Sequence, residues 1–385
     1  MKAETKVIID EKKATTNIEQ LKESPIAKDD WRTHEFSHPE RTIRVGTLFS
    51  GIGAFEHALQ RLGLKHKIVF AGDIDDRCKK AYFANYDISE DDWFSEVEAF
   101  DATPYHGKVD VIVGGAPCQA FSIAGKQLGF EDARGTLFYE FSRVVKETEP
   151  KIFIFENVAR VLTHDNGRTW NVMYSVFKEL GYDIHFRVLN AKDYGIPQSR
   201  NRLFCIGFKN KRNFEYPAPI ELKYVMQDFL EDYDTTRFHN DGMKVLVPDD
   251  SRIGVADGSL WDEFKFKVKP VDEKYYLSEK MCRYVLGTGT KGYTVDRETD
   301  LPIAHALLHT MACQHRSGID NYVTHTGRLR RLTPRECLRL MGFKDSFKIV
   351  CSDTATYQQA GNSIVVDVLI ALIKQLDLSK YGVAN

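Results

Sequence analysis

The stretch RVGTLFSGIGAFE, residues 44–56, carries the strongest signal for the fold. Its first half is an apolar run typical of a buried strand, and its second half is a Gly-x-Gly turn that leads into a helix. Phe55, Leu59 and Leu62 follow with helical spacing, and Gly63 can end this helix as a C-cap. Because another apolar run, KIVFAG at 67–72, comes next, the sequence predicts a strand–helix–strand unit.

Four further apolar runs extend this alternation. They are VDVIVGG (109–115), KIFIFEN (151–157), IHFRVLN (184–190) and RLFCIGF (202–208). Strands that alternate with helices form parallel sheets. Unbroken apolarity, as in the first two of these runs, is typical of strands covered on both faces. We therefore predict an α/β fold in which helices cover both faces of a parallel sheet.

The rest of the chain is less regular, and we divide it by composition. Residues 1–40 are polar and predict an N-terminal extension, and 41–209 form the α/β domain. Residues 210–344 predict a smaller domain, which includes a Pro-started helix in TPRECLRLMGF. Residues 345–385 are expected to return to the first domain, with an amphipathic helix over Ser363–Leu376.

Composition excludes several classes of protein. A hydrophobic fraction of 43% and a charged fraction of 28% are those of a globular chain. The most apolar stretch, Ile364–Leu376, is too short for a membrane span and predicts a core helix, and the N-terminus resembles no secretion signal. The seven cysteines form no Cys-x-x-Cys pair, so we expect neither disulfides nor a metal site. With a net charge of −2, a polyanion would have to meet a local basic surface.

The Gly-x-Gly turn is a candidate ligand site. Glycines let the backbone approach a ligand, and the helix that follows favours a negative group at its N-terminus. Asp73 stands at the tip of the second strand, twenty residues after Gly53, where an acid can hold ribose hydroxyls. The pair predicts a nucleoside cofactor, although a plain structural turn would look similar. Glu56 replaces the third glycine of the dinucleotide pattern, which favours S-adenosylmethionine over NAD.

Cys118 is a candidate nucleophile. It lies in GGAPCQAFSIAGKQLGFEDARG (114–135), a glycine-rich loop at the end of a predicted strand. A lone cysteine is usually a small buried hydrophobe. Here Lys126 and Arg134 are near in sequence, and basic neighbours favour a reactive thiolate.

Two more segments complete the candidate chemistry. Glu156 in FENV ends another apolar strand, where partial burial would raise its pKa and suit it to donate a proton; the alternative is that it caps the next helix. In GIPQSRNR (195–202), Gln198, Arg200 and Arg202 alternate and so should project to one face of a strand. Paired guanidiniums suit a carbonyl oxygen or a phosphate, unless they form a solvated edge.

Together these motifs resemble one family, the DNA cytosine-5 methyltransferases of the prokaryotic and phage modification type. FSGIG, PCQ, ENV, QSRNR, RRLTPRECLRLMGF (330–343) and QAGNSIVV (359–366) occur in the family's order. The resemblance spans about Arg44 to Leu376, except for 210–325. It implies the AdoMet-dependent methyltransferase fold, Rossmann-like with a mostly parallel sheet, and a smaller irregular target-recognition domain.

The resemblance also implies a mechanism. Cys118 would attack carbon 6 of cytosine, so that carbon 5 takes the methyl group of S-adenosyl-L-methionine. Glu156 would hold ring nitrogen 3, and Arg202, with Arg200, would neutralise charge at the carbonyl oxygen. The base must first be flipped out of the duplex, and the loop 119–135 would close over it.

Binding residues follow from the same resemblance. For the cofactor it points to Phe49, Gly51, Gly53, Asp73, Ile74, Asp101, Ala102, Pro117, Asn362 and Ser363. For DNA it points to Gln119, Ser122, Lys126, Arg134, Gln198, Arg328, Arg330 and Arg331. The chain departs from the family at Asp73, usually a glutamate, and at Ala124, where some relatives carry a serine that helps fill the vacated base stack.

The expected partners are double-stranded DNA and S-adenosyl-L-methionine, with no membrane and no metal. We expect a cytoplasmic, nucleoid-associated prokaryotic enzyme that acts as a monomer, and a cognate restriction endonuclease would act separately. Three other functions fit less well: the same chemistry on RNA, a DNA-binding protein without activity, and a nicotinamide oxidoreductase.

Overall fold

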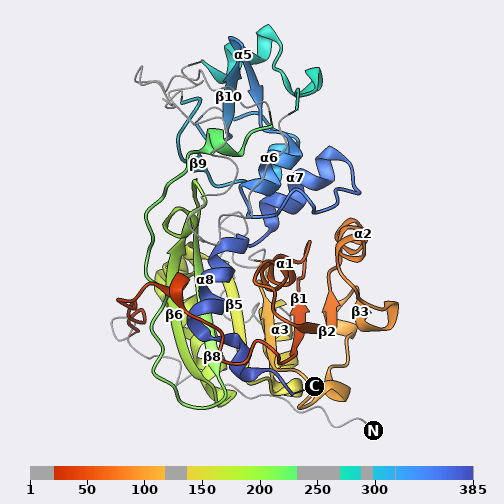
Figure 1. Cartoon of the computed structure of the whole chain (residues 1–385), viewed down its shortest axis with the longest axis vertical. Helices are drawn as coiled ribbons and strands as arrows, with labels where there is room; N and C mark the ends of the chain where they lie inside the picture. The colour runs from red at the N-terminus through yellow and green to blue at the C-terminus, as the bar shows by residue number, and fades with distance from the viewer. Residues whose placement is uncertain (1–20, 118–136, 232–268, 288–297, 317, 385) are drawn as a thin grey trace.

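The computed structural model describes residues 21–117, 137–231, 269–287, 298–316 and 318–384 (Figure 1). A seven-stranded sheet forms the lower part of the molecule in that view, in the order β3-β2-β1-β4-β5-β8-β6. Its strands are β1 (Ile43–Leu48), β2 (His66–Gly72), β3 (Trp93–Phe94), β4 (Val111–Gly114), β5 (Ile152–Val158), β6 (Asp183–Asn190) and β8 (Asn201–Phe208). The six predicted strands are therefore present, and the short β3 is added to them.

The sheet is parallel from β3 through β5, as predicted, but β8 runs antiparallel to both of its neighbours, β5 and β6. The prediction of a parallel strand at 202–208 was therefore wrong. Only residues 191–200 connect β6 to β8, and this link is too short for the crossover that a parallel neighbour requires. The sheet is mostly parallel.

Helices cover both faces of the sheet. The helices α1 (Ala54–Arg61) and α8 (Val366–Leu376) share one buried cluster with Ile152 and Ile154 of β5. The helices α3 (Leu137–Thr148) and α4 (Arg168–Glu179) share a second cluster with Phe153 and Phe155 of the same strand. Alternate residues of β5 thus face opposite layers, and since both layers are apolar the strand reads as one apolar run.

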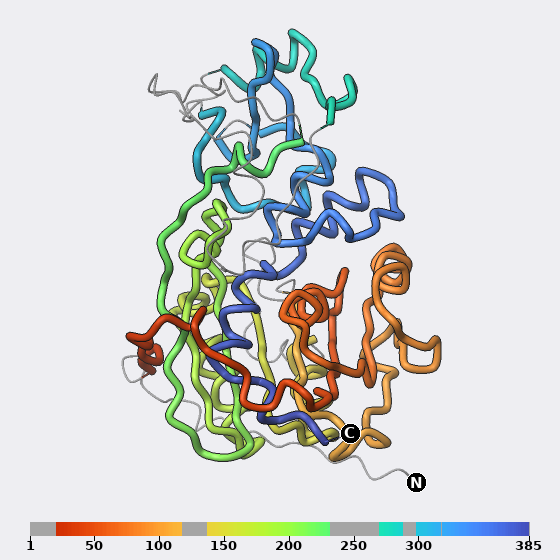
Figure 2. The backbone as a smooth tube through the Cα atoms, in the orientation of Figure 1, coloured from red at the N-terminus to blue at the C-terminus, as the bar shows by residue number. Residues whose placement is uncertain are grey.

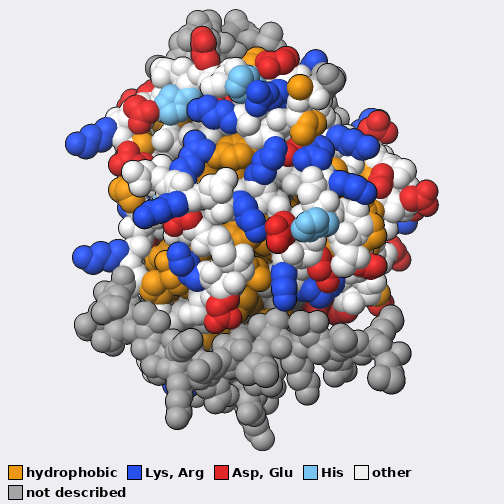
Figure 3. Space-filling model, turned by 90° about the horizontal axis from the view of Figure 1, so that it is seen from below, with side chains coloured by type: hydrophobic (Ala, Val, Ile, Leu, Met, Phe, Trp, Pro, Cys, Tyr) orange, Lys and Arg blue, Asp and Glu red, His pale blue; other side chains and the backbone are white. Residues whose placement is uncertain are grey.

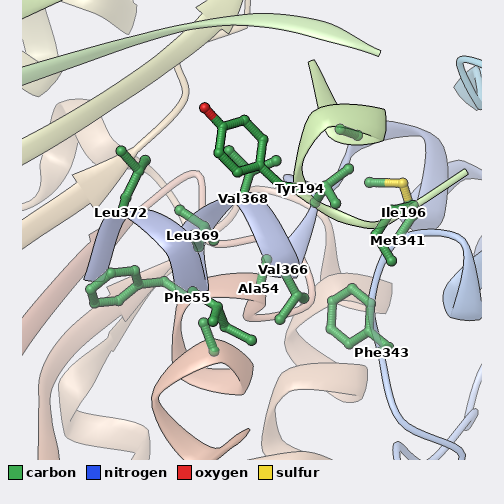
Figure 4. Close-up of a cluster of buried hydrophobic side chains, with 14 of the residues drawn as sticks. Ala54, Phe55, Tyr194, Ile196, Met341, Phe343, Val366, Val368, Leu369 and Leu372 are labelled. Carbon is green, nitrogen blue, oxygen red and sulfur yellow. The ribbon is translucent and has the colours of Figure 1, made fainter. Parts of the chain in front are cut away.

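The first helix forms as its sequence predicts. Gly63 has a φ of 64°, its N–H bonds to the carbonyl of Gln60, and the Leu64 N–H bonds to that of Leu59. Gly63 therefore ends α1 in the left-handed conformation that glycine adopts at low cost. Figure 4 shows Ala54 and Phe55 of α1 beside Val366 and Leu369 of α8.

The upper part of Figure 1 holds smaller elements. They are β10 (Tyr322–His325), β11 (Arg328–Arg331), α5 (Glu279–Val285), α6 (Pro334–Arg339) and α7 (Asp353–Asn362), with the two-residue strands β7 (Gln198–Ser199) and β9 (Ala304–His305). The helix α6 begins at Pro334 as predicted, and Thr333 and Glu336 cap it reciprocally. Figure 2 shows the C-terminal residues returning to the start of β1, where Thr42 pairs with Val383.

The last predicted helix starts later than expected. Ser363 is the C-cap of α7, and Val365 is extended, so α8 begins at Val366 and not at Ser363. By length and composition Asp353–Leu376 could cross a membrane, but 78% of its most apolar window is buried inside the protein. This burial is that of a core helix.

An internal ion pair joins α1 to α8. Arg61 Nη2 lies 2.9 Å from Asp367 Oδ1, with at most 3% of either side chain exposed, and Arg61 Nη1 donates to the carbonyl of Gly342. Changing Asp367 to Asn would leave a buried guanidinium without its countercharge. We expect the free energy of unfolding to fall by about 3–5 kcal/mol, as measured by urea denaturation.

The exposed pair of Arg283 and Glu279 provides the control, since 78% of each side chain is exposed. Glu279→Gln should change the free energy of unfolding by no more than about 0.5 kcal/mol. Equal effects of the two changes would contradict the structural role of the internal pair.

Candidate active site

The candidate residues of the α/β domain gather at one edge of the sheet. The strands β1, β2, β4 and β5 are parallel, so their carboxyl ends lie together. The first three lead into the turn 49–53, Asp73 and the segment 115–117, and Glu156 lies near the carboxyl end of β5 (Ile152–Val158). Open α/β sheets place their ligands at this edge.

The glycine turn after β1 has an unusual backbone. Phe49, Gly51 and Gly53 have φ values of 54°, 54° and 76°, all in the left-handed region. Ser50 holds the turn against β2, since its N–H donates to the Gly72 carbonyl and its hydroxyl accepts from the Gly72 N–H, both at 2.9 Å. Gly53 is also the N-cap of α1. The turn therefore brings the N-terminus of α1 to the ligand edge.

Asp73 lies directly against this turn. Its Oδ2 accepts the Gly51 N–H at 2.9 Å, and its Oδ1 accepts the Asp75 N–H at 3.0 Å. Burial raises the pKa of Asp73, and these two hydrogen bonds oppose the shift. The neighbouring Ile74 is 79% exposed. An exposed apolar side chain beside a carboxylate can take up a flat ring next to a polar sugar.

The other predicted cofactor residues lie on three further segments. Asp101 is exposed and accepts hydrogen bonds from Thr103, while Ala102 is buried. Pro117 is exposed after β4. Asn362 is exposed at the end of α7, and Ser363 is buried there as the helix C-cap. The helix α7 is held beside α2 (Asp76–Asn85), since Gln359 Nε2 donates to the carbonyl of Arg77 at 2.9 Å.

Sequence reasoning missed Tyr86, which supports the glycine turn. Its hydroxyl donates to the carbonyls of Ile52 and Gly53, at 3.1 and 2.7 Å. A Cβ on Gly53 would lie 2.2 Å from the Tyr86 ring. A side chain at this position is therefore disfavoured twice, by the left-handed φ and by the collision with Tyr86. Nothing near Tyr86 in the sequence indicates this contact, because it joins residues more than thirty positions apart.

We expect Gly53→Ala to lower the free energy of unfolding by about 2–4 kcal/mol, from left-handed strain and the collision with Tyr86. Gly63→Ala is the matched control, because it has a similar φ of 64° and open space around the Cβ. It should cost only the strain, about 1–2 kcal/mol. Thermal unfolding of both variants measures the difference, and equal losses would show that the Tyr86 contact adds nothing.

Glu156 and Arg202 form an ion pair at the sheet edge. Arg202 Nε lies 3.1 Å from Glu156 Oε1, with 18% and 13% of the side chains exposed. The antiparallel register of β5 and β8 pairs Val158 with Arg202 and so brings the two side chains together. Burial raises the pKa of Glu156, while Arg202 and Arg200 oppose this. The turn after β5 has Val158 as its N-cap, so Glu156 does not take the capping role.

The chain after β4 runs directly beside Glu156. A Cβ on Gly115 would lie 2.7 Å from Glu156 Oε2, and Asn157 Nδ2 donates to the Ala116 carbonyl at 3.2 Å. Asn157 thus holds the backbone two residues before Cys118 in the sequence. Cys118, Gln119, Ser122, Lys126 and Arg134 lie outside the described residues.

Unlike Arg202, which pairs with Glu156, Gln198 and Arg200 are buried and bind backbone groups. Gln198 is fully buried, donates to the Leu340 carbonyl and accepts from the Leu307 N–H. Arg200 is 3% exposed, and its guanidinium donates to backbone carbonyls. Burial, with the nearby Arg202, lowers the pKa of Arg200 to about 9. Gln198 and Arg200 thus bind the backbone of the same residue, Leu307, whereas Arg202 pairs with Glu156.

The three arginines expected to bind DNA, Arg328, Arg330 and Arg331, differ in their exposure. Arg330 is fully buried and pairs with Glu336, Nη2 to Oε1 at 2.8 Å, so its guanidinium is not at the surface where a phosphate could reach it. Arg328 is exposed and pairs with Glu273. Arg331 is half-buried over the ring of Tyr357.

Figure 3 shows the molecule from below, where lysines and arginines are intermingled with acidic side chains. This face therefore carries charges of both signs. Among the residues that the structure describes, no three His, Cys, Asp or Glu side chains form a group that could hold a metal ion.

The chain is similar in sequence and in fold to known methyltransferases. The model of the family described as C-5 cytosine-specific DNA methylase matches residues 43–377. The type II methyltransferase M.HhaI of Haemophilus parahaemolyticus is 34% identical over 85% of this chain and 92% of its own length. The type II methyltransferase M.HpaII of Haemophilus parainfluenzae is 34% identical over 87% and 89%. The crystal structure of S. pombe Dnmt2 methyltransferase has a similar fold, with a TM-score of 0.63, 19% identity and coverage of 87% of this chain and 98% of that chain.

Proposed function

Because the chain belongs to the C-5 cytosine-specific DNA methylase family, we propose that it methylates carbon 5 of a cytosine flipped out of a short, specific duplex DNA sequence. The methyl donor is S-adenosyl-L-methionine, and a covalent bond to Cys118 activates the cytosine ring. Membership itself supports DNA cytosine-5 methyltransferase activity. The proposal adds the adduct, the flipping and the specific sequence.

One observation carries the proposal: the Glu156–Arg202 pair stands beside the segment that leads to Cys118. A cytosine presents ring nitrogen 3 and a carbonyl oxygen side by side on one edge. A carboxyl with a raised pKa can give a proton to that nitrogen, and a guanidinium can neutralise charge on the oxygen. The pair therefore matches the edge of this base.

The residues act on the ring in sequence. The Cys118 thiolate forms a bond to carbon 6, and Glu156 protonates or holds ring nitrogen 3, so that carbon 5 becomes electron-rich. Arg202 stabilises charge at the carbonyl oxygen. After carbon 5 is methylated, water takes its proton and the electron pair of that bond re-forms the ring double bond, which expels the Cys118 thiolate. Glu156 takes back the proton from ring nitrogen 3.

The groups at the strand ends fit S-adenosylmethionine. It supplies a methyl group on a positively charged sulfur. Asp73 would accept from the ribose hydroxyls, Ile74 offers an apolar face, Gly51 has open space where a Cβ would stand, and Gly53 begins the helix α1 at this site. The remaining residues proposed for this site are Phe49, Asp101, Ala102, Pro117, Asn362 and Ser363.

Duplex DNA is the proposed substrate, and the base leaves the stack at a cost of a few kcal/mol. Arg328 and Arg331 are proposed phosphate contacts, since both reach the surface. We propose a monomer that acts in the cytoplasm of a prokaryotic cell, with a restriction endonuclease as a separate protein. The alternative substrate is RNA, on which the same residues would perform the same chemistry.

The test is expression in a host that lacks cytosine methylation, followed by conversion sequencing of the host DNA. We expect protected cytosines in one short motif with the wild-type protein, and none with the Cys118→Ala variant. Soluble wild-type protein that binds S-adenosylmethionine but protects no cytosine would overturn the DNA proposal. Transfer of a labelled methyl group to RNA in place of duplex DNA would then establish the alternative.

A further inference from the structure

The buried guanidinium of Arg200 joins three separate backbone carbonyls. Nη1 donates to Leu307 O at 2.7 Å, and Nη2 donates to Gly361 O at 2.8 Å and to Ser363 O at 2.9 Å. With 3% of the residue exposed, these bonds form away from water. Charge-assisted hydrogen bonds of this kind are stronger than neutral ones.

The three carbonyls belong to segments that meet at this point. Leu307 follows β9, whereas Gly361 and Ser363 lie at the end of α7. The two segments are in close contact, because a Cβ on Gly361 would lie 2.3 Å from His309 N and 2.4 Å from the Leu308 carbonyl carbon. Carbonyl oxygens that converge in this way repel each other unless a positive donor lies between them. Arg200 is that donor.

The backbone of Arg200 is also held. Its N–H donates to Asn190 Oδ1 at 3.0 Å, and its carbonyl accepts the Ala191 N–H at 3.2 Å. Two residues further along the chain, Arg202 pairs with Glu156. A short, fixed piece of backbone thus separates the α7 end from the pair proposed to hold the cytosine.

We propose that Arg200 is a positioning residue that ties the Glu156–Arg202 pair to the turn carrying Asn362 and Ser363. Since that turn is part of the proposed cofactor site, the tie couples cofactor binding to the geometry of the pair. This inference rests on the proposed function for the identity of the cofactor. It replaces the expectation that Arg200 touches the cytosine itself.

Lysine cannot take this place. It keeps the positive charge, but its single ammonium does not reproduce the planar fork that serves carbonyls on two segments. Arg200→Lys should therefore loosen the turn at 361–363 without removing the charge near Glu156. Arg202→Lys is the matched control, because it makes the same change two residues away, at the ion pair.

The experiment measures S-adenosylmethionine affinity without DNA by calorimetry, and the methyl transfer rate in a single turnover. For Arg200→Lys we expect affinity to fall about tenfold or more, as the loss of one or two charge-assisted bonds implies, together with a slower transfer. For Arg202→Lys we expect slower transfer with affinity within about twofold of wild type. Arg200→Lys that binds the cofactor as wild type does and loses only rate would overturn the tie.

Hydrogen exchange on the wild-type protein gives a second test that needs no variant to fold. S-adenosylmethionine alone should increase amide protection at 199–203 and 305–309, as well as at 49–53 and 73–75. Protection confined to the last two segments would overturn the coupling. Wild-type protein that binds the cofactor but methylates no DNA would overturn the proposed function and not the role of Arg200. The hydrogen-exchange result would still test that role.

Discussion

Replacing Cys118 by alanine is expected to abolish methylation, with a fall in rate of at least about 10⁴-fold. Carbon 5 of cytosine is part of an aromatic ring and becomes a nucleophile only after a group has added to carbon 6. Without the thiolate, Glu156 and Arg202 can still hold the base, but no residue adds to the ring. Single-turnover transfer of a labelled methyl group to duplex DNA measures the loss.

Cys313→Ala is the control, because Cys313 is an exposed free cysteine that belongs to no strand of the seven-stranded sheet. Its rate should match that of the wild type. The Cys118→Ala protein should still bind duplex DNA and S-adenosylmethionine, since both are held by other residues. A Cys118→Ala rate within tenfold of wild type would rule out the covalent mechanism.

Glu156→Gln is expected to lower the transfer rate by about 10²–10⁴-fold, the usual contribution of a positioned proton donor. Glutamine keeps the shape and can accept a hydrogen bond, but it has no proton to give as an acid. The change also leaves the guanidinium of Arg202, only 18% exposed, without the carboxylate that lies 3.1 Å from it. The measurement is the single-turnover rate at saturating cofactor and DNA.

Glu140→Gln provides a matched control for this change. Glu140 also pairs with an arginine, Arg143, at 2.8 Å, but on the helix α3 and not at the strand ends. Its variant should keep the wild-type rate within about twofold. If Glu156→Gln retained most of its rate, ring nitrogen 3 would need another proton donor, and the observation that carries the proposed function would lose its force.

Much of the α/β domain could be predicted because its signals are local. The sequence signals for the Gly-x-Gly turn, the C-cap at Gly63 and the Pro-started helix α6 each lie within a few consecutive residues. A strand with both faces covered needs apolar residues at every position, so β5 was visible as a run. Parallel strands end at one edge, which placed Asp73 and Glu156 on the same side of the sheet.

Long-range contacts decided the remaining features. The direction of β8 depends on which strands it pairs with, and this pairing carries Arg202 to Glu156. Alternation within QSRNR could not show that Arg200 would be drawn to carbonyls of residues more than a hundred positions away. Arg330 and Glu336 are only six residues apart, but a distant segment also binds this pair, since the Glu231 N–H donates to Glu336 Oε1 at 2.7 Å.

Local sequence therefore determined which residues lie at strand ends and turns, since hydrogen-bond periodicity and backbone conformation act over a few residues. The tertiary structure decided which charged side chains lie at the ligand edge and which form buried bonds that hold backbone segments together. The reason is that the position of a buried charged side chain depends on the group that it pairs with. Partners such as Arg202 and Glu156, or Arg200 and Gly361, come into contact only when distant segments pack together.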